Sequence, residues 1–287
     1  AGEVVIIAII LAGIGLVKDV KYTGDRSLDL VGAGFSVVGM GGIVLGILIW
    51  QEGGEKVLAF IAAGIASLGL LAWWLLRQKR RGSVPLIDPD LFRSKHFRIG
   101  VSSQMLQQTA LGALMIALPI FFQMVLEYNA LQAGLAVAPM SLTMFAVATL
   151  AGRSGGWGRK PSTLIRAGFA ILAVGVAAMI PLVPRTDSAL LLALPLAIVG
   201  AGVGVLVSQL NNYTLAPISE ERVSEAAGVN SAGGSFGLSF GLAFAGAIML
   251  ATLSLGFTRS AESSAVLPPA EQQQVAPALD EDAEIMS

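Results

Sequence analysis

The sequence predicts an all-α integral membrane protein, a polytopic helical bundle, and three observations lead to this prediction. Hydrophobic residues make up 55% of the 287 residues, whereas charged residues make up 13%, against ~25% in soluble domains. A soluble domain of this length has too little interior to bury so much apolar surface. Long stretches without charge recur along the chain, and none alternates between polar and apolar residues as a transmembrane β-strand does.

Seven charge-free stretches are long enough to cross a membrane, which takes about 20 apolar residues. They cover residues 30–51, 57–76, 99–126, 128–152, 167–184, 188–219 and 226–258. Residues 4–17 form a further apolar stretch that is short for a span, and it lacks the preceding basic residues of a signal peptide. We expect residues 1–17 to be the end of a transmembrane helix that begins upstream, so that the sequence is a fragment.

The composition also disfavours several functional classes. The chain has no cysteine, which excludes disulfides, thiolate metal sites and thiol catalysis within it. One histidine, His96, disfavours a histidine metal centre or catalytic triad, and a net charge of -1 gives no sign of nucleic-acid binding. We therefore expect no enzymatic activity, no cofactor, no metal site and no nucleic-acid partner. The partner that the composition does imply is the lipid bilayer.

Lys and Arg are distributed unevenly over the connections between the spans. Residues 17–29, 77–98, 152–166 and 217–225 carry 15 of the 18 basic residues, and the alternate connections carry the other 3. Because basic residues concentrate in cytoplasmic connections, these four segments are predicted to be cytoplasmic. The same alternation predicts that residues 259–287, which are rich in Pro, Gln, Ser and acidic residues, lie on the extracytoplasmic side of the membrane.

The connection between the second and third spans contains the acidic pair Asp88-Pro89-Asp90. Such a pair is a possible metal-diphosphate site of a membrane prenyl transferase. No second acidic cluster stands on an inner connection, which argues against that chemistry.

The span 99–126 carries three amides on one helical face. Gln104, Gln107 and Gln108 fall within an arc of about 100°, because positions i, i+3 and i+4 share a face. Bare amides in lipid cost free energy, so this face should meet other helices or water. Two interpretations stay open: a polar patch on a substrate cavity, or interhelical hydrogen bonds that hold the bundle together.

A second polar group lies at the cytoplasmic end of the span 188–219. It includes Gln209 and Asn212, which are interfacial by position but are also candidates for the cavity. Away from their ends, the predicted spans contain no Asp, Glu, Lys, Arg or His. The carrier residue of any proton coupling is therefore not visible in this sequence.

The last span, 226–258, has small residues at every fourth position, including Gly233, Gly237 and Gly241. Small residues let helix backbones approach closely, which suits tight packing or sliding of one helix on another. We expect these glycines to be helix-packing residues.

Three motifs, taken in order, resemble those of a known family. The inner loop GRSGGWGRK, residues 152–160, resembles the signature G-x-x-x-D-x-x-G-R-[RK] of the major facilitator superfamily. Gly156 stands where that signature has Asp, and the G-R-K run arrives one residue early. The stretch RRGSVPLIDPDLFRSKHFR is similar to the loop entering the second transport half of the fourteen-helix drug:proton antiporters. The stretch AAGVNSAGGSFGLSFGLAFAGAI is similar to the Gly-rich helix near the end of that half.

The resemblance implies a domain organisation. Residues 18–97 would hold the two extra linker helices of the fourteen-helix members and a basic cytoplasmic loop. Residues 98–258 would hold five spans of the C-terminal transport half, with its last helix absent, and 259–287 an extracytoplasmic loop. The N-terminal transport half would also be missing. Gly152, Arg159 and Lys160 would belong to a gating loop whose usual Asp is lost.

The resemblance further implies a function. The chain would be part of a proton-coupled multidrug efflux antiporter that works by alternating access in a bacterial inner membrane. Its partners would be protons and a small amphipathic or cationic substrate. An exporter of a specific metabolite, lipid or siderophore is the alternative, and a membrane enzyme or a non-transporting sensor is a more distant one.

Overall fold

A computed structural model of the chain describes residues 29–49, 55–81, 87–153 and 158–262. The predicted helix end at 1–17 and most of the predicted outer loop at 259–287 lie outside these residues. The described part is built of helices, and seven of them are long and apolar enough to cross a membrane. They are α2 (Leu30–Leu48), α3 (Glu55–Arg80), α4 (Lys95–Ile120), α5 (Ala130–Arg153), α6 (Pro161–Met179), α7 (Leu190–Leu215) and α8 (Val223–Glu262). The predicted all-α class and the seven predicted spans are confirmed.

Several boundaries differ from the predicted ones for local reasons. α6 begins at Pro161 rather than at 167, because proline suits the first turn of a helix. α3 includes the basic run up to Arg80, which the charge criterion assigns to the following loop. α8 runs to Glu262, so 259–262 are helical rather than part of the predicted outer loop. No proline or glycine between 257 and 262 interrupts this helix.

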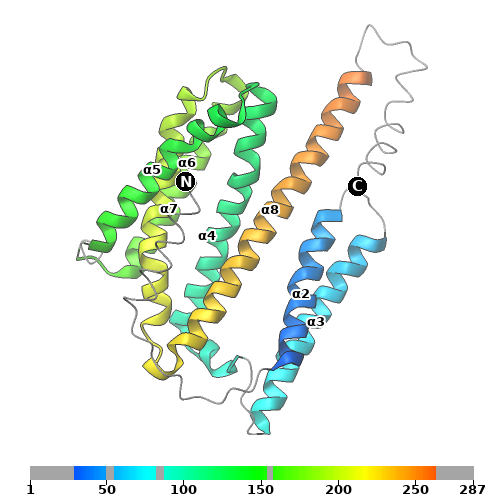
Figure 1. Cartoon of the computed structure of the whole chain (residues 1–287), viewed down its shortest axis with the longest axis vertical. Coiled ribbons are helices and arrows are strands. Elements are labelled where there is room, and N and C mark those ends of the chain that lie inside the picture. Colours follow the sequence, from blue (N-terminus) through cyan, green and yellow to red (C-terminus); the bar gives the residue numbers. More distant parts are fainter. Residues whose placement is uncertain (1–28, 50–54, 82–86, 154–157, 263–287) are drawn as a thin grey trace, which may run out of the picture.

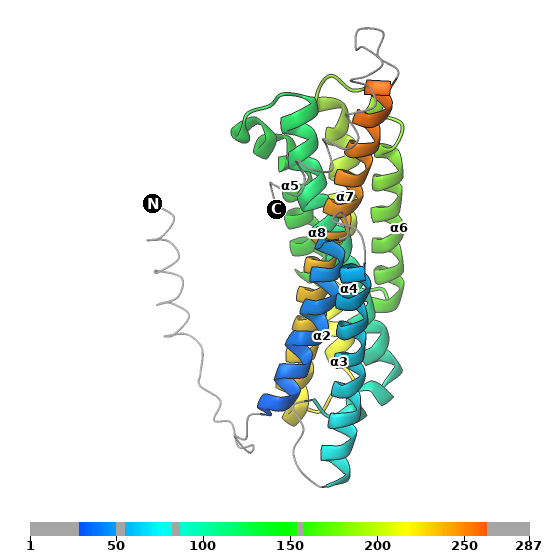
Figure 2. The ribbon, with the colours of Figure 1, turned by 90° about the vertical axis from the view of Figure 1, so that its right-hand side faces the viewer.

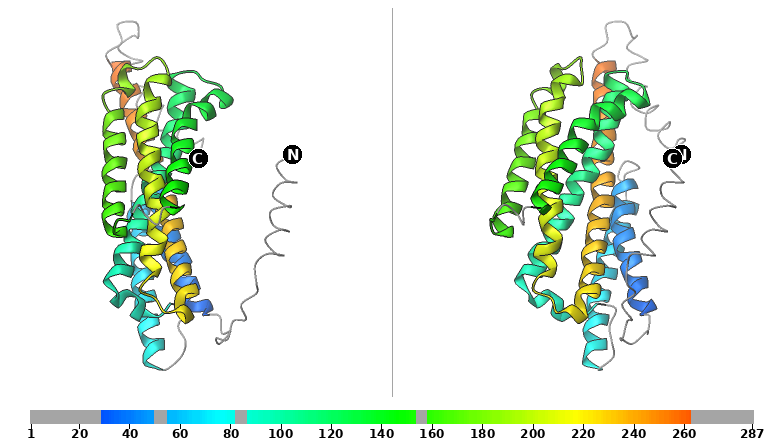
Figure 3. Two further views of the ribbon diagram at one scale, coloured as in Figure 1. Left: turned by 90° about the vertical axis from the view of Figure 1, so that its left-hand side faces the viewer. Right: turned by 60° about the vertical axis from the view of Figure 1, so that its left-hand side comes forward.

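The helices form two groups, α5 to α7 on one side and α2, α3 and α8 on the other, and α4 joins them. α5 and α6 both pack on α7, while α4 packs mainly on α8 and also touches α7. The hairpin of α2 and α3 lies on the other side of α8, where α2 makes the contact (Figure 1). The side views in Figures 2 and 3 show that α2 runs alongside α8 over most of the length of α2. The start of α2, the end of α3, the start of α4 and the α7–α8 connection all lie at the lower end in Figure 1.

α7 is the centre of the group that it forms with α5 and α6. In its most apolar part 56% of residues are buried, against 11–22% in the other six spans. The fully buried residues recur at alternating steps of three and four, which places them on one stripe: Leu192, Leu196, Val199, Val203, Leu206 and Leu210. The remaining helices expose many large apolar side chains, as expected of surfaces that face lipid.

Three glycines let α7 approach its neighbours on two sides. A Cβ at Gly204 would lie 2.6 Å from the Met144 carbonyl oxygen of α5. A Cβ at Gly202 would lie 2.6 Å from the Leu172 backbone nitrogen of α6, and Gly200 faces α5 again. The G-x-G-x-G run at 200–204 is therefore a helix-packing device.

Candidate functional site

Gln104 and Gln108 of α4 lie along α8. A Cβ at Gly234 of α8 would stand 3.4 Å from the Cγ atom of Gln104 and 3.6 Å from that of Gln108. Both glutamines are half-buried. Their side chains therefore pass beside α8 at a point where glycine leaves room for them, and part of each stays accessible.

Gln107 is in a different setting from its two neighbours. It is 1% exposed, and its Oε1 atom has no hydrogen-bond partner within the described residues. It follows Gly100 by seven residues, so the two share a face of α4, and Gly100 packs directly on Thr214 of α7. The Gln107 amide thus lies on the α7 side of α4, with a buried acceptor that no described residue satisfies.

The structure does not bring the second predicted polar group to the α4 glutamines. Gln209 is 6% exposed, and its Nε2 atom donates to Ser208 Oγ at 3.2 Å. It follows Gly202 by seven residues and so shares the face of α7 that packs on α6. Asn212 is exposed.

A buried amide that the sequence analysis passes over lies on α8. Asn230 is 5% exposed, its Nδ2 atom donates to Asn211 Oδ1 of α7 at 3.2 Å, and its own Oδ1 atom lacks a partner among the described residues. Its position in a charge-free, glycine-rich span hides it from a search for charged groups. A search for amides inside the spans would have found it.

The three predicted packing glycines face α4 in register. A Cβ at Gly233 would stand 3.1 Å from Val101 Cγ1, while Gly237 and Gly241 face the carbonyl oxygens of Met105 and Thr109. Each step of four residues on α8 therefore matches a step of four on α4. Side chains in place of Gly237 or Gly241 would meet backbone, which cannot move aside as a flexible side chain does.

The predicted gating loop is described only at its edges. Gly152 is exposed near the end of α5, and Arg159 and Lys160 are exposed just before α6. Gly158 has a φ of 68°, in the left-handed region that glycine adopts without strain. Gly156, which replaces the expected Asp, lies outside the described residues.

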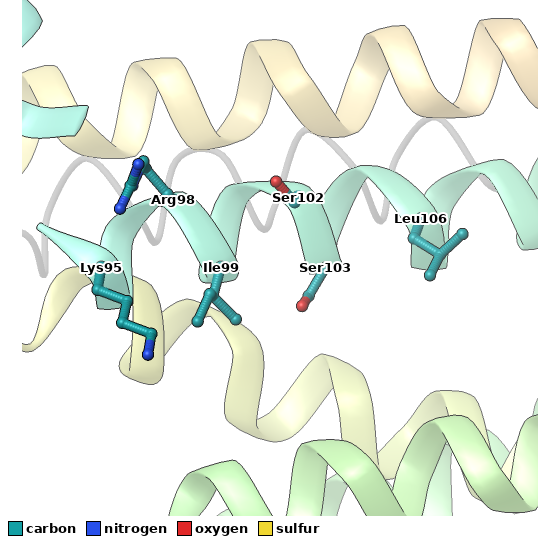
Figure 4. Close-up of a pocket in the computed structure, with 6 residues that line it drawn as sticks. All are labelled: Lys95, Arg98, Ile99, Ser102, Ser103 and Leu106. Carbon is teal, nitrogen blue, oxygen red and sulfur yellow. The ribbon is translucent and has the colours of Figure 1, made fainter. Parts of the chain in front are cut away.

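A groove of about 440 Å³ runs along the first turns of α4 (Figure 4). Figure 4 shows the side chains that line it, which are Lys95, Arg98, Ile99, Ser102, Ser103 and Leu106. Neither Lys95 nor Arg98 makes an ion pair with a described residue. None of the predicted glutamines lines the groove, because it occupies a different face of α4.

The acidic pair Asp88 and Asp90 is part of an ion-pair cluster. Lys79 contacts both carboxylates, and Arg222 pairs with Asp88 at 3.1 Å. No group of three or more His, Cys, Asp or Glu within the described residues is arranged to hold a metal ion. The pair is thus engaged with basic side chains.

Comparison with known proteins agrees with this architecture. The sequence model described as Major Facilitator Superfamily matches residues 26–242. The "Probable actinorhodin transporter" of Streptomyces coelicolor is 26% identical over 267 residues, which cover 91% of this chain and 45% of that protein. The "Multidrug resistance protein Stp" of Mycobacterium tuberculosis is 26% identical over 80% of this chain and 42% of its own length. The "Multidrug export protein EmrB" of Escherichia coli is 29% identical over 46% of this chain and 26% of its own length.

The chain thus spans less than half the length of these relatives. The matched family region reaches from just before α2 into α8, and so includes six complete membrane-spanning helices and part of the seventh. With seven apolar helices, close glycine-mediated packing and this match over most of its length, the chain belongs to the Major Facilitator Superfamily.

Proposed function

We propose that this chain is part of a proton-coupled multidrug efflux antiporter that works by alternating access. The observation that carries the proposal is the family match over residues 26–242, together with relatives named as multidrug resistance and export proteins. In this mechanism two helical halves rock around a cavity near the middle of the membrane. The proposed location is a bacterial inner membrane, and the proposed substrates are small amphipathic or cationic compounds.

We assign the helices of this chain to the second part of a fourteen-helix transporter. α2 and α3 are the extra linker pair, and α4 to α8 are five helices of the second transport half. The open groove on α4 supports this assignment. α4 pairs with α8 as α7 pairs with α5, and α7 is covered in addition by α6, whereas no described helix covers the groove face of α4 in the same way. A sixth helix seated there would make the two sets of three helices equivalent.

The roles of the α4 glutamines and of the loop before α6 are part of the same proposal. Gln104, Gln107 and Gln108 would supply hydrogen bonds without fixed charge to varied substrates. Arg159 and Lys160 would belong to the loop that gates the cytoplasmic side. The coupling residues would lie in the first transport half.

Export of one particular compound is the alternative. The name "Probable actinorhodin transporter" of the relative that matches 91% of this chain favours it. The two candidates differ in the breadth of substrates, since a multidrug cavity accepts compounds that share only amphipathic character.

Transport by the full-length protein in proteoliposomes tests these candidates. We expect an imposed proton gradient to drive accumulation of several unrelated amphipathic cations, with protons moving in the opposite direction. Residues 1–287 alone should give no gradient-driven transport, because a single half has no facing surface to close a cavity. Transport of one compound only would favour the specific exporter, and gradient-driven transport by residues 1–287 alone would contradict the requirement for a second half.

A further inference from the structure

The cytoplasmic end of the chain holds a network of charges around Asp88. This residue begins the short turn Pro89–Arg93, where its side chain accepts a hydrogen bond from the Asp90 amide at 2.9 Å. The proline at the next position fixes the backbone for the turn. Asp88 is thereby held in one orientation before any partner approaches.

Two distant parts of the chain converge on that carboxylate. Lys79 at the end of α3 reaches Asp88 Oδ1 at 2.6 Å and also contacts Asp90. Arg222, just before α8, reaches Asp88 Oδ2 at 3.1 Å. Glu225 of α8 accepts a hydrogen bond from the Asp88 amide and pairs with Arg222 at 3.4 Å. One aspartate therefore joins α3, the turn that precedes α4, and the start of α8.

An apolar cluster accompanies these charges. Leu91, Phe97 and Ala226 are 0–2% exposed, and the side chains packed around them include Ile218, which precedes Arg222 by four residues. The paired side chains are 28–36% exposed, apart from Arg93, which is 85% exposed. Ion pairs on an open surface contribute little to stability, but partial burial and shared partners increase this contribution.

The α2–α3 hairpin and α8 also touch within the membrane, where α2 packs on α8. The α2–α3 hairpin is thus attached to α8 at two levels. The membrane contact uses α2, and the cytoplasmic contact uses the end of α3. Two attachments at different depths resist a tilt of the hairpin, which a single contact would permit.

We propose that the network of Lys79, Asp88, Arg222 and Glu225 is a clasp that holds the α2–α3 hairpin on the second transport half throughout the transport cycle. The hairpin and helices α4 to α8 then move as one body, and the hairpin is not a hinge between moving parts.

Distance measurement between spin labels in the full-length protein tests the clasp. Labels at Leu58 of α3 and Leu190 of α7, which are 72% and 83% exposed, report on the hairpin and the second half. We expect one narrow distance distribution, unchanged by substrate or by an imposed proton gradient. A second label pair joining the two transport halves shows that the conditions change the state. A distance between residues 58 and 190 that differs between the two states would overturn the proposal.

Charge variants separate the clasp from general stability. Lys79→Glu should broaden the distribution between 58 and 190, because the new carboxylate then faces those of Asp88 and Asp90. Lys79→Arg keeps the positive charge and should leave the distribution narrow. Arg93→Glu is the matched control, since among the described residues Arg93 pairs only with Asp90 of its own turn. A narrow distribution in Lys79→Glu, or equal broadening in Arg93→Glu, would count against the clasp.

Transport by the same variants gives a second arm, which rests on the proposed function. At equal membrane abundance, Lys79→Glu should lower transport about tenfold, whereas Lys79→Arg should keep most of it. Should Lys79→Glu fail to reach the membrane, Lys79→Cys with Asp88→Cys replaces it, because this pair joins the end of α3 to the turn before α4. A short cleavable thiol crosslinker should then leave transport unchanged, whereas loss of transport that cleavage reverses would show that the cluster must open. If no variant or wild type transports any drug, the proposed function fails while the distance arm still decides the clasp.

Discussion

Gln107 carries an amide acceptor into the interior of a membrane bundle without a described partner for it. Such a group costs free energy unless water or a ligand supplies a donor. Gln104 and Gln108, which lie beside Gly234, are only half-buried. The three side chains that share a helical arc in the sequence therefore have two different environments in the fold.

Substitution of Gln107 by leucine tests whether its amide serves transport. Leucine has a similar size and leaves no polar group unpartnered, so the free energy of unfolding should not fall. If the amide binds water or substrate in the cavity, the ranking of exported compounds should change. The control is Gln123→Leu, because Gln123 is exposed just beyond the end of α4 and donates to the Pro119 carbonyl. Unchanged ranking in Gln107→Leu, Gln108→Leu and the double variant would rule out the cavity role.

The pH dependence of the clasp follows from Asp88. Partial burial would raise the pKa of this carboxyl, but the hydrogen bonds from Lys79 and the Asp90 amide and the charge of Arg222 outweigh it and lower the pKa below its ordinary value. A lowered pKa in the folded state stabilises the fold above the ordinary pKa, and the contribution disappears as the pH falls through the lowered value. The 58–190 distance distribution should therefore be the same at about pH 8 and about pH 5. Broadening near neutral pH would show that Asp88 does not control the clasp.

At the scale of single helices, the packing of α8 depends on positions where glycine leaves out a side chain. Its glycines on the α4 side allow backbone contact over several turns, and Gly237 and Gly241 face carbonyl oxygens of α4. Close approach of backbones compensates for the weak hydrophobic driving force between helices in lipid. The position of α8 fixes α4 on one side and α2 on the other.

Two alanine substitutions on α8 separate packing from helix propensity. Gly228→Ala meets nothing within 4 Å, so alanine should raise stability by up to about 1 kcal/mol through its better helix propensity. Gly237→Ala places a methyl group against the Met105 carbonyl and should lower stability and the melting temperature in detergent. Equal effects of the two substitutions would show that the glycine contact does not hold α8 to α4.

At the scale of the whole molecule, the uneven distribution of Lys and Arg agrees with the positions of the helix ends in the bundle. The ends of the helices that the basic residues assign to the cytoplasm meet at one end of the structure, apart from the partly described α5–α6 connection, which lies somewhat higher (Figure 1). The Asp88 clasp lies at that end as well. The basic residues there have two roles, since some are predicted to orient the chain and others pair with acids.

Labelling of single cysteines tests the orientation, and residues 1–287 offer a background without any cysteine. Asp187 lies in the α6–α7 connection and Glu220 in the α7–α8 connection, and both are exposed. In intact cells a membrane-impermeant thiol reagent should label Asp187→Cys and spare Glu220→Cys, because only the first is predicted to lie outside. The reverse pattern would invert the proposed topology.

The sequence by itself determined the all-α class, the seven spans and the family resemblance, because a membrane span is a local property of about 20 consecutive residues. Local patterns also show that glycine recurs every four residues on one face of α8. The partner of that face, the separation of Gln209 from the α4 glutamines and the burial of Gln107 were decided by tertiary structure alone. Each depends on which helix covers which face, and contacts such as Asp88 with Glu225 join residues far apart in the chain. In lipid many apolar faces are equivalent, so hydrophobic pattern cannot choose between them and close packing does.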